Sequence, residues 1–192
     1  MKKTPPQDYS LLGSFVIPVA LALRQLGVDP LEILDQTGID LAKGANPEWR
    51  VSREDFGDLM ARCVEASGDE AFGLLAAEHL QPQVLHSLGL AWLASDTVYD
   101  GLQRLQRFSG LVSSGMVLRL AEEGERVHLY LSAAPGLEQG VPASHDYAVG
   151  MITRMCRLTL GEFLAPLIIR MKRTPPAEPE RWEYLLSSRV VF

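Results

Sequence analysis

The sequence predicts an α+β fold, in which an N-terminal helical bundle is followed by a small antiparallel sheet packed against helices. Apolar residues recur at helical spacing through much of the first 81 residues, and again over residues 145–160. Two segments of alternating apolar and polar residues flank an acidic, glycine-containing turn at residues 122–125. With 47% hydrophobic and 22% charged residues, the 192-residue chain can bury a full core.

The predicted organisation is a disordered tail over residues 1–8 and one domain over residues 9–192. Within that domain we expect a helical part at about 9–81 and a mixed α/β part at about 82–192. The apolar run at residues 11–23 follows Met1-Lys2-Lys3 and superficially resembles a signal peptide. Pro18 interrupts this run, which is also shorter than the roughly 20 apolar residues that span a bilayer. A cytoplasmic protein is therefore predicted.

The helical part contains a clear series of start and stop signals. Residues 9–26 have a helical pattern in which Pro18 predicts either a kink or two abutting helices, and Gly27 ends the pattern. A short helix is expected over residues 31–36, ending at Gly38. Ser52 is a suitable N-cap for the next helix, because its side chain can accept a hydrogen bond from a free backbone N–H. One more helix should end before Pro82.

The best-defined local structure lies between residues 85 and 133. A short apolar helix precedes Thr97, which with Asp100 approximates a capping box for a helix reaching Ser113. We expect an antiparallel hairpin from residues 116–120 and 127–131. The predicted buried face of the capped helix consists of Val98, Leu102, Leu105, Phe108 and Val112.

Beyond the hairpin the pattern predicts a loop to about Pro142 and a helix over residues 145–160 that ends at Gly161. Residues 163–171 should form a strand and residues 181–186 a short helix. Residues 189–192 begin another apolar strand at the end of the sequence. We therefore expect the chain to be part of a longer protein.

Charge and cysteine usage limit the possible functions. The formal net charge is −6, which argues against nucleic-acid binding by this chain alone, because phosphate binding requires clustered Lys and Arg. Cys63 and Cys156 lie within apolar helical patterns and are predicted to be buried free thiols. Their spacing does not match a zinc site.

No catalytic motif is visible, and we predict a protein that is not an enzyme and needs no cofactor or metal. The Gly-x-Ser-x-Gly elbow, the phosphate-binding glycine loop and the His-Glu-x-x-His zinc motif are all absent from the sequence. The sequence's four histidines are scattered. A cluster of glutamates at residues 122–125 is expected to be a solvated turn.

Four side chains are candidates for a small-molecule pocket: Trp92, Arg107, Tyr147 and Arg154. Trp92 lies on an apolar helix, where its buried indole N–H would need a partner. Tyr147 and Arg154 are seven residues apart on one predicted helix, so both could point into one cavity. Alternatively, Arg154 runs along the surface and Tyr147 belongs to the core.

The order of these elements resembles the N-terminal effector-binding, arabinose-binding-like domain of AraC-type transcriptional regulators, in the branch that responds to ornithine and arginine. The similarity extends from about Leu12 to the end of the chain. It is carried by these segments: Leu26-Gly27-Val28-Asp29-Pro30, Thr37-Gly38-Ile39, Arg50-Val51-Ser52, Gly68-Asp69-Glu70-Ala71-Phe72-Gly73-Leu74, Leu88-Gly89-Leu90-Ala91, Ser95-Asp96-Thr97-Val98, Pro166, Arg173-Thr174-Pro175-Pro176 and Val190-Val191-Phe192.

This resemblance implies a domain that senses a small effector, such as an amino acid or a related metabolite, and forms a homodimer. It also implies that a pair of helix-turn-helix units binds DNA in a C-terminal part that this sequence lacks. The family has no ligand-contact motif that can be placed residue by residue here. The alternative hypothesis is a stand-alone haem, gas or small-molecule sensor, with His79 or His86 as a candidate iron ligand.

Overall fold

The computed structural model describes residues 9–137, 140–161 and 164–192, so the tail predicted at residues 1–8 lies outside the described part. Its elements, in chain order, are β1 (Ser10–Leu12), η1 (Gly13–Phe15), α1 (Val16–Gln25), α2 (Pro30–Thr37), η2 (Leu41–Ala45), β2 (Arg50–Ser52), α3 (Arg53–Ser67), α4 (Phe72–Glu78), η3 (Pro82–Leu85), α5 (Ser87–Leu93), α6 (Val98–Val112), β3 (Met116–Glu123), β4 (Arg126–Ala133), α7 (Pro142–Leu160), β5 (Ile168–Arg170), α8 (Pro179–Leu186) and β6 (Arg189–Val191).

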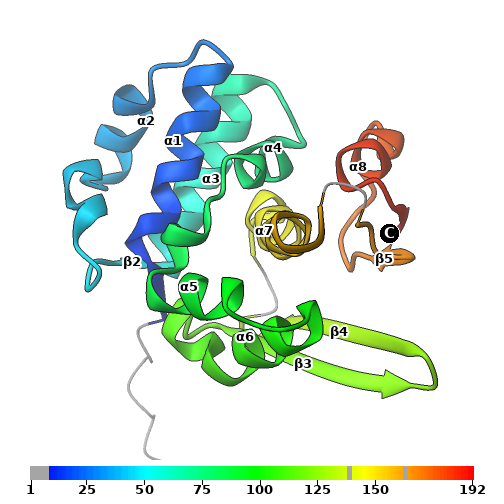
Figure 1. The fold of residues 1–192 in the computed structure, drawn as a ribbon. Coiled ribbons are helices and arrows are strands. Elements are labelled where there is room, and N and C mark those ends of the chain that lie inside the picture. Colours follow the sequence, from blue (N-terminus) through cyan, green and yellow to red (C-terminus); the bar gives the residue numbers. More distant parts are fainter. Residues whose placement is uncertain (1–8, 138–139, 162–163) are drawn as a thin grey trace, which may run out of the picture.

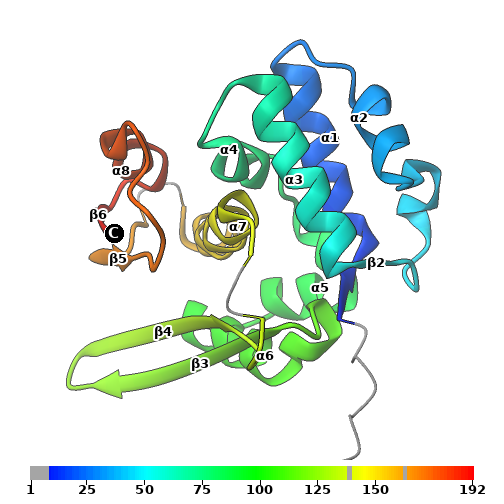
Figure 2. The ribbon, with the colours of Figure 1, turned by 180° about the vertical axis from the view of Figure 1, so that it is seen from behind.

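The elements surround α7, which lies near the centre of the molecule (Figure 1). Helices α1 to α4 form a bundle on one side, and α4 makes the most extensive packing contact with α7. Helices α5 and α6 and the β3–β4 hairpin lie below this bundle, while α8, β5 and β6 lie on the far side of α7. Seen from behind, the hairpin extends outward beyond α6 (Figure 2). The predicted α+β class is confirmed.

The predicted helix boundaries in the first half follow from local capping. Asp29 caps α2 through its side chain, and Gly38 ends the same helix with a φ of 69°, a left-handed conformation that favours glycine. Ser52 caps α3 by accepting a hydrogen bond from the Asp55 backbone N–H. The capping box of α6 is complete, because Thr97 and Asp100 each bond to the other's backbone N–H.

Two sequence predictions near the N-terminus and on α6 are wrong. Residues 10–12 form strand β1, which pairs antiparallel with β2, whereas a helix was predicted from residue 9. At Pro18 the structure has the second predicted alternative, two abutting helices: η1 runs directly into α1, and Pro18 lies in the first turn of α1, where its missing N–H has no helical partner to lose. Phe108 is 41% exposed and does not belong to the buried face of α6.

The hairpin prediction is confirmed, with a register that runs from Met116 opposite Ala133 to Glu123 opposite Arg126. Near the C-terminus, β5 and β6 form a parallel pair of three residues each, connected through α8. The predicted strand over residues 163–171 is shorter in the structure, covering Ile168–Arg170, and its predicted first residue, Phe163, lies outside the described residues.

The core consists of two clusters. The larger joins α1, α3, α4, α5, α6 and α7, and the smaller holds the C-terminal unit against α4 through Ala71, Leu74, Met171, Trp182, Leu186 and Val190. Cys63 and Cys156 are buried free thiols, as predicted. Within the described residues, every helix is too short or too polar to cross a lipid bilayer.

Candidate functional site

Trp92, the first of the four predicted pocket residues, lies inside the core with 1% of its surface exposed. Its indole Nε1 donates a hydrogen bond to Thr159 Oγ1 of α7 at 2.7 Å. Gly101 of α6 lies against the indole, and a Cβ built on this glycine would be 3.0 Å from the ring. Trp92 therefore joins three helices, and its polar group is already satisfied.

Tyr147 and Arg154 point to different parts of the structure despite sharing α7. The Tyr147 hydroxyl donates to the Phe15 carbonyl at 3.2 Å, and its ring packs against Phe15 and Phe56. Arg154 is 16% exposed and lies 4.0 Å from Glu78 of α4. Neither side chain lines the two hollows described below.

Arg107 is exposed on α6, where its guanidinium lies 5.4 Å from the centre of the Phe108 ring. The structure therefore does not bring the four predicted residues together around one cavity. A ligand role for them stays a prediction.

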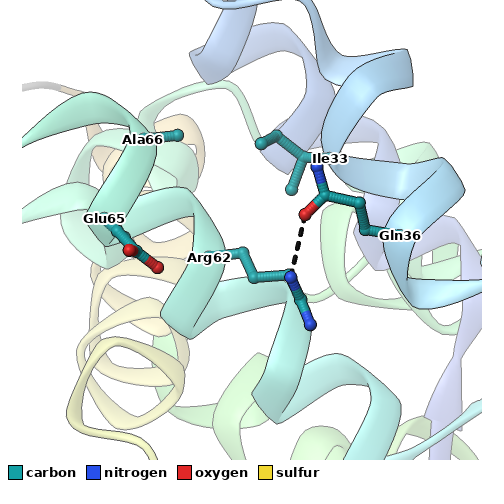
Figure 3. A pocket seen from close by; sticks show the side chains of 5 residues that line it. All are labelled: Ile33, Gln36, Arg62, Glu65 and Ala66. Atoms are coloured by element: carbon teal, nitrogen blue, oxygen red, sulfur yellow. Dashed lines mark hydrogen bonds between the residues drawn. The ribbon is translucent and has the colours of Figure 1, made fainter.

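One hollow, of about 330 Å³, lies between α2 and α3 and is lined by Ile33, Gln36, Arg62, Glu65 and Ala66 (Figure 3). Arg62 lies across it, donating to Gln36 Oε1 at 2.8 Å and to Asp58 at 2.9 Å. Its cation is thus already paired with the carboxylate of Asp58, one turn away on the exposed face of α3, so it offers a ligand no unpaired charge.

A second hollow, of about 280 Å³, lies where β1, β2, the η3–α5 junction and the end of α6 meet. We call it the Arg50 hollow; its lining residues are Leu12, Pro47, Arg50, Leu85, His86, Ser87, Leu88, Leu111 and Val112. Most of this surface is apolar, and its cationic side chain is Arg50. This volume is just below the roughly 300–1,000 Å³ typical of small-molecule sites.

Within the described part of the chain, Arg50 makes three hydrogen bonds, all to neutral oxygen atoms. Its Nε donates to Ser10 Oγ at 3.2 Å, one terminal nitrogen donates to the Ser10 carbonyl at 3.0 Å, and the other donates to the Leu111 carbonyl at 2.5 Å. Partial burial lowers the pKa of Arg50 from its usual value, because desolvation disfavours the charged form. Arg50 thus ties the β1–β2 pair to the end of α6.

His86 has an unusual backbone conformation and a buried side-chain nitrogen that makes no hydrogen bond to the described residues. Its φ of 52° and ψ of −131° place a residue with a Cβ in a region that glycine usually occupies. Its imidazole Nε2 is enclosed by the protein and has no hydrogen-bond partner among the described residues. An unsatisfied buried polar atom and a strained backbone together point to a functional position.

Sequence reasoning considered His86 only as an iron ligand and did not select Arg50 as a site residue. In the described part of the chain, no three His, Cys, Asp or Glu side chains gather closely enough to hold a metal ion. His79, the other candidate iron ligand, has its Nε2 at 2.6 Å from Gln25 Oε1. No local motif marks the Arg50 hollow, since its walls come from four separate segments of the chain.

The α+β fold with a ligand-sized hollow is consistent with a ligand-binding domain, and comparison with known families makes the class specific. The model of the arabinose-binding domain of AraC transcription regulators, N-terminal, matches residues 27–192. The chain belongs to this family, which comprises regulatory ligand-binding domains and is not an enzyme family. The matching model describes the family as a whole and not one of its branches. Membership of the ornithine- and arginine-responsive branch therefore stays a prediction.

Among solved structures, the chain is similar to the transcriptional regulator CdpR from Pseudomonas aeruginosa, with a TM-score of 0.61 and 15% sequence identity. The similarity covers 93% of this chain and 51% of the CdpR chain, so this chain spans about half the length of that regulator. At this identity the similarity establishes the fold alone. The search of curated proteins found no match.

Proposed function

We propose that this chain is the effector-sensing domain of an AraC-type transcriptional regulator. Membership of the family carries this proposal. The Arg50 hollow supports it, because it combines an apolar lining with a cation that no carboxylate among the described residues neutralises. In this function, effector binding biases the domain's contacts with the DNA-binding part, a coupling typically worth about 1–3 kcal/mol.

DNA binding in this proposal belongs to a helix-turn-helix part outside the present sequence, in a regulator that works in the cytoplasm. The net charge of −6 supports this division, because an acidic domain is repelled by the phosphate backbone. An operator-binding assay with the full-length regulator and a metabolite panel tests the function. At least one compound should change operator affinity, with about 5- to 150-fold as the usual range. If no compound changes affinity or transcription, the sensing function is wrong.

Homodimerisation is the second component of the proposal. Large apolar side chains are exposed on the adjacent helices α5 and α6, namely Leu90, Leu93, Phe108 and Leu111. Exposed apolar surface of this kind is characteristic of interaction sites. Sedimentation of the chain over a range of concentrations tests the dimer. Leu90→Asp should weaken association, whereas Leu167→Asp, at an exposed leucine far along the chain, is the matched control.

A further inference from the structure

We propose that the Arg50 hollow binds a small carboxylic acid that has an apolar body and lacks an ammonium group. This inference rests on the proposed sensing function and specifies the chemical class of its effector. It also differs from the amino-acid effector suggested by family resemblance. Three properties of the hollow carry it: the state of Arg50, the composition of the walls and the strain at His86.

Arg50 has N–H groups that make no hydrogen bond to the described residues. A guanidinium carries five N–H groups, and hydrogen bonds to Ser10 and Leu111 account for three of them. Its acceptors are a hydroxyl and two carbonyl oxygens, so no carboxylate among the described residues neutralises its charge. A guanidinium in this state binds a ligand carboxylate through charge-assisted hydrogen bonds, which are about twice as strong as neutral ones.

The remaining walls select for an apolar ligand body. Leu12, Leu85, Leu88 and Val112 are all at least nine-tenths buried, and each contributes to the hollow. Leu111 is 64% exposed and lies at its rim. The buried side chains offer a ligand an apolar contact surface, and a ligand that covers Leu111 removes apolar surface from water, which favours binding.

The same walls disfavour a free amino acid. No Asp or Glu lines the hollow among the described residues. An α-ammonium group beside Arg50 would experience repulsion from the guanidinium, and it would lose water without gaining a carboxylate partner. The hollow therefore distinguishes a carboxylic acid from its 2-amino derivative.

His86 provides the third argument. Its unpartnered Nε2 and its positive φ both raise the free energy of the empty protein. Because His86 lines the hollow, a carboxylate bound there offers its imidazole a hydrogen-bond acceptor. Since His86 directly precedes α5, the ligand would act on the start of that helix.

A matched set of three probes tests the ligand class: 3-phenylpropanoate, its amide 3-phenylpropanamide, and phenylalanine, which is its 2-amino derivative. Calorimetric titration of each probe into the 192-residue chain gives the affinities. We expect 3-phenylpropanoate to bind at least about tenfold more tightly than the other two, as a charge-assisted hydrogen bond implies. Equal binding of all three, or no carboxylate binding at millimolar concentration, overturns the proposal.

Variants locate the binding. Arg50→Gln should abolish the preference for the carboxylate over the amide, a ratio that does not depend on overall stability. His86→Gly should weaken carboxylate binding without lowering the thermal unfolding midpoint, because glycine tolerates the local φ. Arg62→Gln, in the hollow between α2 and α3, is the control and should leave all three affinities unchanged.

Two results contradict the assignment to the Arg50 hollow: an effect of Arg62→Gln on carboxylate affinity, or an unchanged carboxylate preference in folded Arg50→Gln. The operator assay separates this inference from the proposed function. If some compound alters operator affinity but 3-phenylpropanoate does not bind, the carboxylate class is wrong and the sensing function stands. If no compound acts, the sensing function itself fails.

Discussion

The indole Nε1 of Trp92 donates a hydrogen bond of 2.7 Å to Thr159 Oγ1, joining α5 to α7 inside the core. Thr159 Oγ1 in turn donates to the Met155 carbonyl at 3.0 Å. Both polar side chains are thereby satisfied without water. Because α5 starts next to His86, this bond also connects the helix beside the Arg50 hollow to the central helix of the molecule.

Thr159→Val should destabilise the protein by about 1–3 kcal/mol, because the Trp92 N–H would remain buried without an acceptor. Thr159→Ser keeps the hydroxyl and should cost much less. Urea denaturation of both variants, followed by tryptophan fluorescence, measures the difference. Equal stability of the two would show that the hydrogen bond contributes nothing measurable.

Gly150→Ala should destabilise the contact between α4 and α7. A Cβ built on Gly150 would lie 2.6 Å from the Ala77 Cβ, so the two helices would have to separate. Overpacking of this kind typically costs about 1–3 kcal/mol. Thermal unfolding monitored by circular dichroism measures the effect.

Gly110→Ala is the control for this substitution, because Gly110 also lies within a helix but has nothing within 4 Å of a built Cβ. Here alanine should stabilise the protein by up to about 1 kcal/mol, through the higher helix propensity of alanine. If both alanine variants shift stability in the same direction, the close approach of α4 and α7 does not decide the outcome.

Asp146 should make stability depend on pH. Burial raises the pKa of this carboxyl to about 7, against the opposing effect of Arg173, to which it is ion-paired. The folded protein then binds the proton more tightly than the unfolded chain, whose value is near 3.8. The contribution of Asp146 to stability is therefore greatest below the unfolded pKa and is lost as pH rises toward 7.

Denaturation of the wild type and of Asp146→Asn between roughly pH 5 and pH 8 measures this linkage. The free energy of unfolding of the wild type, relative to the variant, should fall as pH rises. Asp35→Asn, at an exposed aspartate of α2, controls for the change in net charge. Parallel pH profiles for the wild type and Asp146→Asn would contradict the prediction.

The two cysteines should be unreactive in the native protein. Burial raises the pKa of both thiols, Cys63 and Cys156, to about 12, so the nucleophilic thiolate is scarce at neutral pH. A disulfide reagent should label neither thiol on the timescale of minutes and both after denaturation. Rapid labelling under native conditions would show that these thiols are accessible.

Much of the fold could be predicted because its signals are local. Asp29, Ser52 and the Thr97–Asp100 capping box start helices through side chains within three residues of the backbone groups they satisfy. The β3–β4 hairpin likewise depends on alternation and a two-residue turn. Strand β1 was missed because its apolar residues pair with β2, about 40 positions away, a contact that helical periodicity does not reveal.

The candidate site could not be predicted in the same way. The aromatic and cationic residues chosen from the sequence were plausible by type, but Tyr147 fills the core, Trp92 bonds to Thr159 and Arg107 faces solvent. Which face of a helix is buried depends on the partner helix as well as on its own pattern. The Arg50 hollow instead combines residues from strands, a 3-10 helix and two α-helices.

The sequence by itself therefore determined the α+β class, most helix boundaries and the hairpin, because capping, turns and periodicity act over a few residues. Only the tertiary structure decided that, among the residues it describes, Arg50 meets no carboxylate and the His86 Nε2 has no hydrogen-bond partner beside an apolar hollow. Those properties depend on which distant segments approach one another. Long-range packing sets that arrangement, and no local pattern encodes it.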